Sequence, residues 1–123
     1  MPFPYETLDV YKKSLKFVAS IESLVSSLKG KASYNLRDQL SRASLSVPLN
    51  IAEGYGRWNL KERIQFGRIS RGSAFECAAV LQVLYEMDLT TEAQFMELYM
   101  RIEEVAKMLT GWVRSLEQLS EAS

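Results

Sequence analysis

The most constraining feature of this sequence is an apolar repeat of three and four residues that runs through most of the chain. It is clearest in two segments, where alternating steps of four and three connect Leu60 to Tyr85 and Phe95 to Leu119. Such a repeat places one apolar stripe along an α-helix and is typical of helices that pack side by side. Because no alternating strand pattern competes with it, the chain is predicted to be all-α.

Stop and start signals divide the pattern into four helices. Gly30 is suited to end the first helix, and Ser33 can cap the second. Asn59-Leu-Lys-Glu62 and Thr91-Glu-Ala-Gln94 have the spacing of capping boxes. Long helices with short links predict one domain over residues 1–123, an antiparallel up-down-up-down four-helix bundle. The expected helices cover about residues 7–29, 34–55, 60–87 and 91–119.

Composition excludes most catalytic and metal chemistry. The chain has 123 residues, contains no histidine, and carries no phosphate loop, nucleophile elbow or dinucleotide fingerprint. Its one cysteine, Cys77, lies among alanine and valine and is expected to be a small buried residue. We therefore expect no enzyme, no cofactor and no metal. No apolar run reaches about 18 residues, and no signal pattern opens the chain, which favours a cytoplasmic protein without a membrane partner.

The stretch SVPLNIAEGYGR, residues 46–57, interrupts the second predicted helix with residues that helices usually avoid. Pro48 removes a backbone donor and clashes with the carbonyl one turn earlier, so a kink is predicted there. Gly54 and Gly56 loosen the end of the same helix. A kinked helix in a bundle bends around another helix or another subunit.

The second and third helices also carry polar side chains at positions where the helical periodicity predicts apolar ones. Buried charges are costly unless they are paired, so a structural network between these helices is expected. Arg71 can pair with Glu53 and Arg42 with Glu76, or Arg42 can pair with Glu53 of a facing chain. A ligand-binding carboxylate is the functional alternative. The proposed network comprises Arg42, Asn50, Glu53, Arg71, Ser73 and Glu76.

Charge is distributed unevenly along the chain. Residues 37–75 hold seven basic and three acidic side chains, whereas residues 76–123 hold three basic and nine acidic ones. Clustered cations attract phosphates, and neighbouring aromatic rings can stack on unpaired bases. The plain alternative is a solvated face whose aromatics cover the end of the bundle. The candidate nucleic-acid-binding residues are Arg37, Tyr55, Arg57, Trp58, Lys61, Arg63 and Arg68.

Two segments resemble the signature of a known family. They are QLSRASLSVPLNIAEGYGR at 39–57 and RISRGSAFE at 68–76, and the opening LDVYKKSLKFV is also similar. They resemble a bacterial four-helix-bundle family of proteins encoded by the intervening sequence of 23S ribosomal RNA genes, also described as ribosomal-type proteins. A related branch is the accessory variability determinant of diversity-generating retroelements. The similarity extends from about residue 8 to residue 84.

This resemblance implies an antiparallel bundle that assembles into a ring-shaped homopentamer. In the retroelement branch it also implies binding of nucleic acid and of a reverse transcriptase. The expected function is therefore that of a non-enzymatic oligomer associated with ribosomal RNA or another nucleic acid through the basic patch on the second and third helices. The alternative is a homo-oligomeric protein-interaction scaffold, such as an accessory subunit for a polymerase, whose acidic fourth helix meets a basic protein partner without direct RNA binding.

Overall fold

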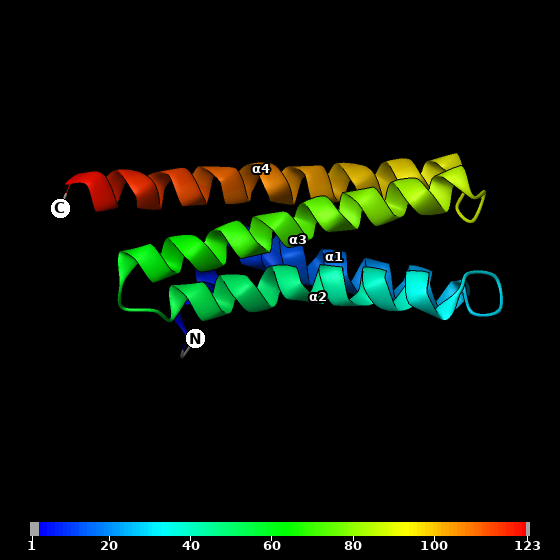
Figure 1. Ribbon diagram of the computed structural model, residues 1–123, viewed down its shortest axis with the longest axis horizontal. Coiled ribbons are helices and arrows are strands. Elements are labelled where there is room, and N and C mark those ends of the chain that lie inside the picture. Colours follow the sequence, from blue (N-terminus) through cyan, green and yellow to red (C-terminus); the bar gives the residue numbers. More distant parts are fainter. Residues whose placement is uncertain (1–2, 123) are drawn as a thin grey trace.

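The computed structural model describes residues 3–122, which form four long helices after a short 3₁₀ turn (Figure 1). The predicted all-α class and four helices are confirmed, and the described residues contain no strand. The last helix extends three residues beyond its predicted end. The elements are η1 (Pro4–Thr7), α1 (Asp9–Ser27), α2 (Tyr34–Tyr55), α3 (Leu60–Glu86) and α4 (Glu92–Ala122).

Successive helices run in opposite directions along the bundle (Figure 1). The α1–α2 and α3–α4 turns lie at one end, and the α2–α3 turn lies at the other end, beside the start of the chain. Gly30 adopts a φ of +80° in the α1–α2 turn, a conformation that glycine reaches without strain. This arrangement brings η1 against the C-terminal part of α2, which positions the site described below.

Side chains cap the helices where the sequence predicts helix starts. The Ser33 hydroxyl accepts a hydrogen bond from a backbone N–H in the first turn of α2, and the Asn59 side chain does the same for α3. At α4 the capping box is reciprocal. Thr91 Oγ1 accepts from the Gln94 backbone at 3.1 Å, and Gln94 Oε1 accepts from the Thr91 backbone at 2.9 Å. Satisfied end groups are the reason that such short links can separate long helices.

The predicted stripe of α4 lies in the core along the middle of the helix, whereas α1 buries Val10, Phe17, Ile21 and Leu24. At the ends of the stripes predicted for the third and fourth helices, Tyr85 and Leu119 are 39% and 57% exposed. Cys77 is buried as predicted, and burial, with the nearby Glu76 carboxylate, raises the pKa of its thiol to about 12. The side chains that are almost completely shielded from solvent include Phe17, Ile21, Leu40, Val47, Ile51, Leu81, Leu84, Ile102, Val105 and Leu109.

Helices α2 and α3 approach closely along the unusual segment. Pro48 is buried inside α2, which is continuous across it, and the kink predicted at Pro48 stays a prediction. Ser70 Oγ of α3 donates to the Val47 carbonyl oxygen of α2 at 2.8 Å in a fully buried contact. Gly54 lies against α3 so tightly that a Cβ there would be 2.7 Å from Phe66 Cβ. Small residues therefore set the separation of these two helices.

The close approach at Gly54 predicts that a larger side chain at this position lowers the stability of the protein. Gly54→Ala places a methyl group against a side-chain stem that cannot move freely, so we expect the free energy of unfolding to fall by about 1–2 kcal/mol. Gly111→Ala is the matched control, because no atom lies within 4 Å of its added Cβ. It is expected to gain about 0.5–1 kcal/mol from helix propensity. Urea denaturation measures both, and an equal gain at both positions would contradict the packing described.

Candidate nucleic-acid interface

A cleft of about 820 Å³ opens at the end of the bundle where α2 turns into α3. Its walls come from η1, from the last turns of α2 and from the first turn of α3. The cleft combines aromatic, arginine and small side chains, which is the composition of a surface that can hold flat and anionic groups. The lining residues are Phe3, Pro4, Tyr5, Leu49, Ala52, Glu53, Tyr55, Gly56, Arg57 and Arg63.

Arg63 is held in place over the end of α2. Its Nη2 and Nε donate to the Arg57 carbonyl oxygen at 2.9 Å and 3.3 Å. Its guanidinium carbon lies 5.1 Å from the centroid of the Tyr55 ring. A guanidinium has five N–H donors, and the bonds to the Arg57 carbonyl occupy two of them. Arg63 therefore offers donors to a ligand without having to be ordered first.

Arg57 forms the second cationic part of the cleft. Its Nη2 lies 2.5 Å from Glu53 Oε1, one helical turn earlier, and its guanidinium carbon lies 4.9 Å from the Phe66 ring centroid. Both partners of the ion pair remain partly exposed to solvent. An exposed pair of this kind contributes little to stability, so its arginine stays available to a competing anion.

Aromatic rings continue from the cleft in two directions. Tyr55 stacks on Trp112 of α4, with ring centroids 6.5 Å apart and planes 17° from parallel. Tyr5 contacts Phe3 at 5.6 Å and meets the edge of Tyr11 at 4.9 Å. These contacts fix the rings, so a planar ligand would meet surfaces that are already oriented.

The seven predicted binding residues do not form one patch. The cleft brings together Tyr55, Arg57 and Arg63. Trp58 lies in the adjoining turn and is 100% exposed, so no ring among residues 3–122 covers it. The seven therefore separate into a cleft group and three outlying cations, Arg37, Lys61 and Arg68.

The three outlying cations belong to other surfaces. Lys61 and Arg68 line a shallow groove between α3 and α4, where Arg68 is ion-paired with Glu117. Arg37 lies near the start of α2, at the opposite end of the bundle, and its Nε donates to the Ala32 carbonyl oxygen at 3.3 Å. Within one chain, the prediction that Arg37 joins the same surface is wrong, because the length of α2 separates it from the α2–α3 turn.

Hydrogen bonds connect polar residues of α2 and α3, and most of the groups involved are neutral. Asn50 Nδ2 donates to the Ser46 carbonyl oxygen and to Ser46 Oγ, both at 2.8 Å. Ser46 Oγ lies 2.8 Å from Ser73 Oγ of α3, which closes the network across the two helices. Gln39 Nε2 donates to Glu76 toward the start of α2. Of the six residues in the predicted network, Asn50, Ser73 and Glu76 take part in these bonds, whereas Arg42, Glu53 and Arg71 have other partners.

The intrachain pairings Arg71–Glu53 and Arg42–Glu76 are wrong. Arg71 faces α4, where its Nε donates to Thr110 Oγ1 at 2.7 Å and its guanidinium lies over the Phe75 ring at 4.4 Å. Arg42 projects into solvent and pairs with Asp38 of its own helix at 3.0 Å. Glu53 points toward the cleft, away from Arg71. The pairing of Arg42 with Glu53 of a facing chain stays a prediction.

Phe3 and Tyr5 are cleft residues that the sequence does not reveal. They precede the first helix, where no periodicity predicts that the chain folds back onto α2. The only local signal is the aromatic and proline content of PFPY, which does not by itself indicate a contact. Among residues 3–122, no three acidic or cysteine side chains gather into a group suited to a metal ion. In the same range no helix has the length and apolar character that crossing a bilayer requires.

The fold and the site together define an all-α four-helix bundle with an aromatic and arginine-lined cleft at one end. Residues 6–111 match the family described as 23S rRNA-intervening sequence protein. The chain belongs to this family, as the central segments of the sequence indicate. None of the curated proteins matches the chain.

A solved structure confirms the fold. It is the crystal structure of a protein of unknown function from the S23 ribosomal protein family of Bacteroides thetaiotaomicron VPI-5482. The two chains superpose with a TM-score of 0.81 at 24% sequence identity, over 85% of this chain and 97% of the other. At this identity the similarity establishes the four-helix architecture.

The environment of Arg71 predicts a moderate effect of its removal. Arg71→Ala loses one hydrogen bond and one ring contact, so we expect a loss of about 1–2 kcal/mol of unfolding free energy. A buried ion pair would cost about 3–5 kcal/mol when broken. Arg42→Ala is the control, because its exposed pair within one helix is worth no more than about 0.5 kcal/mol. Equal losses for the two variants in urea denaturation would contradict the contacts of Arg71.

Proposed function

We propose that the protein is a non-enzymatic homo-oligomer that binds unpaired segments of ribosomal RNA, or of another nucleic acid, in the cleft at the α2–α3 end. The observation that carries the proposal is the convergence of Tyr55, Arg57 and Arg63 with Phe3 and Tyr5 on one surface. The family to which the chain belongs takes its name from the intervening sequence of 23S ribosomal RNA, which supports RNA as the ligand.

Stacking supplies the part of the binding that does not depend on base identity. Base–aromatic stacking is worth about 1–3 kcal/mol per base and tolerates any base. Unpaired bases are the usual targets of such sites, because the bases of a duplex are already stacked on one another. The exposed Trp58 offers a further ring next to the cleft. A single strand can therefore continue from the cleft across the α2–α3 turn.

Charge limits how strongly one copy can bind. The cleft holds two arginines and one glutamate, and the whole chain has equal numbers of acidic and basic side chains. Glu53 repels phosphate, while its oxygens can accept a hydrogen bond from an amino group of a base. Several copies in one ring would raise the effective concentration of such weak sites. Oligomerisation is thus part of the proposal.

The outer face of α2 and α3 supplies a surface for self-association. Leu45, Leu49 and Ile69 are about half exposed there, although large aliphatic residues usually lie inside. Gly72 lies on the same side of α3, and no atom of the chain is within 4 Å of a Cβ added to it. A helix-interior glycine costs about 1 kcal/mol relative to alanine, so close approach by another copy would explain its presence. The number of copies, five, comes from the family resemblance.

A charge reversal at the cleft should weaken nucleic-acid binding. We expect Arg57→Glu combined with Arg63→Glu to abolish binding of a fluorescently labelled single-stranded RNA, measured by anisotropy. Lys29→Glu combined with Lys31→Glu reverses the same charge at the opposite end and should leave binding unchanged. For two phosphate contacts per chain, the wild-type affinity should fall about sevenfold between 50 and 200 mM salt. Absence of binding by wild-type protein at low salt would refute the proposed ligand class.

If copies of the chain associate through the outer face of α2 and α3, a substitution on that face should lower the mass of the oligomer. Light scattering on the wild-type protein should report five times the 14.0 kDa of one chain. Ile69→Glu places a charge in the proposed contact and should yield smaller species, because an unpaired buried charge costs several kcal/mol. Leu15→Glu, on the exposed side of α1, serves as the control. A wild-type protein that is monomeric at all concentrations would contradict the oligomeric part of the proposal.

A separate observation favours the second candidate function, a protein-interaction scaffold. Residues 72–104 carry seven acidic side chains and one basic one. These residues form the C-terminal part of α3 and the N-terminal part of α4, at the end of the bundle opposite the cleft. A surface of this charge repels nucleic acid and is suited to a basic protein.

A further inference from the structure

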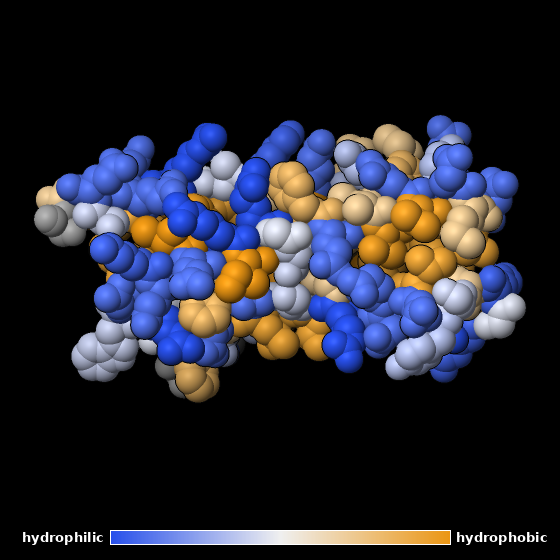
Figure 2. Space-filling view, in the orientation of Figure 1, coloured by the Kyte–Doolittle hydropathy of each residue, from blue (hydrophilic) through white to orange (hydrophobic). Residues whose placement is uncertain are grey.

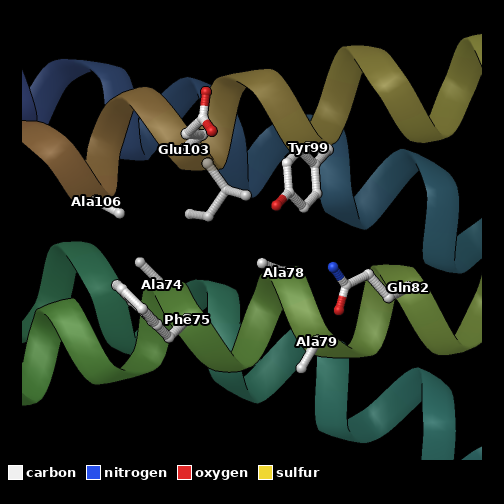
Figure 3. Close-up of a pocket in the computed structure, with 9 residues that line it drawn as sticks. Ala74, Phe75, Ala78, Ala79, Gln82, Tyr99, Glu103 and Ala106 are labelled. Carbon is white, nitrogen blue, oxygen red and sulfur yellow. The ribbon is translucent and has the colours of Figure 1, made fainter.

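A groove of about 410 Å³ lies between α3 and α4, in the acidic half of the bundle (Figure 3). Ala74 of α3 lies opposite Ala106 of α4, Ala78 lies further toward Tyr99, and these small side chains leave space between the two helices. Tyr99 and Gln82 point toward one another at one end of the groove (Figure 3). The groove is thus an apolar trough with polar groups at its rim.

The wall beside Tyr99 is rigid. Tyr85 of α3 stacks on Phe95 of α4 with centroids 4.7 Å apart, and Phe95 contacts Tyr99 at 5.4 Å. At the other end, Phe75 is held under the Arg71 guanidinium. Because both ends are fixed by ring contacts, the groove is preformed and does not depend on a ligand to open it.

Exposed apolar side chains occur in the last turns of α3 and the first turns of α4, the same part of the bundle as Gln82 and Tyr99 of the groove. Met87, Met96 and Met100 are 54%, 45% and 60% exposed, and Val83 on the neighbouring turn of α3 is also exposed. Figure 2 shows hydrophobic side chains gathered over this half of the face, toward the α3–α4 turn, with hydrophilic ones around them. Methionine is flexible and polarizable, so exposed methionines are typical of surfaces that adapt to apolar helix faces.

Acidic side chains lie around the Tyr99 end of the groove, whereas Arg71 and Lys107 lie toward its other end. Glu103 lines it, and Glu86 follows Gln82 by one helical turn and so lies on the same side of α3. Glu92 lies two turns before Tyr99 on the equivalent side of α4. No ion pair occurs at Glu86 or Glu92 within the described part of the chain, whereas Glu103 has a loose pair with Lys107 at 3.7 Å. An apolar occupant with cations along its flanks would neutralise this rim.

We propose that the α3–α4 groove is a docking site for a basic amphipathic helix of a partner protein. The aliphatic residues of that helix, spaced by three and four positions, fill the space between the alanines and contact the methionines. Its lysines or arginines meet Glu86, Glu92 and Glu103. This inference rests on the scaffold function, the second candidate above, and gives it a site and a partner chemistry. It does not depend on nucleic-acid binding, because the groove and the cleft share no lining residue.

A designed peptide tests the site directly. The probe is a fluorescently labelled amphipathic peptide about 18 residues long, or roughly five turns, with leucine every third or fourth position and lysine on both flanks. A matched peptide replaces each lysine with glutamate. We expect the lysine peptide to bind the full-length protein, with a gain of helical circular dichroism, and the glutamate peptide to bind at least about tenfold more weakly.

Variants locate the binding on the chain. Glu86→Lys with Glu103→Lys should weaken lysine-peptide binding about tenfold or more, whereas Glu22→Lys with Glu121→Lys makes the same charge change away from the groove and should not. Gln82→Trp fills the rim and should also weaken binding. All five substituted residues are exposed, so circular dichroism should show unaltered folding.

Three results would overturn the proposal. They are no binding of the lysine peptide, equal binding of both peptides, and equal weakening by the two glutamate double variants. If the Gln82→Trp variant forms a smaller oligomer than the wild-type protein, a second copy of the chain occupies the groove, and the proposal is overturned. RNA anisotropy on the same variants is a separate measurement. Its outcome does not bear on the groove, so the two proposals fail independently.

Discussion

The close packing of α2 against α3 is the constraint on which the rest of the structure depends. Gly54 against Phe66, the Ser46–Ser73 contact and the Ser70 hydroxyl on the Val47 carbonyl draw the two helices together along their length. A small side chain on one helix at each contact lets the backbones approach, and the hydroxyls find partners there. The α2–α3 turn is held as a consequence, and with it the orientation of Tyr55 and Arg63 at the end of the bundle.

The polar residues of the helix interfaces show how this chain avoids the cost of buried charge. Neutral groups occupy the buried part of the α2–α3 contact. A hydrogen bond between neutral groups is worth about 1 kcal/mol, and burying it does not require removing an ion from water. Arg71, which is partly buried, donates to the Thr110 hydroxyl of α4 and lies over the Phe75 ring. All of the ion pairs among residues 3–122 lie on the surface, where such pairs contribute little to the free energy of unfolding.

The two candidate binding surfaces differ in charge and lie in different parts of the bundle, while Lys29, Lys31 and Arg37 lie at the α1–α2 turn. The α2–α3 end carries the arginines and rings of the cleft, and the α3–α4 end carries acidic side chains around an apolar groove. Helix α3 extends through both regions, since it begins beside the cleft and ends beside the acidic rim. The net charge of zero is therefore the sum over two surfaces of different charge, each suited to a different kind of partner. Composition alone does not reveal that these surfaces are separate.

The sequence by itself determined the helices and their ends. The three-four repeat, the Ser33 and Asn59 caps and the Thr91–Gln94 box are local signals, because each depends on residues within one or two turns. The central motif also identified the family. Only the tertiary structure decided which polar residues meet, since a rotation of α3 directs Arg71 to Thr110 instead of Glu53. It likewise decided that Phe3 and Tyr5 join the cleft and that Arg37 does not. Contacts between distant segments depend on helix rotation and length, which periodicity within one helix leaves undetermined.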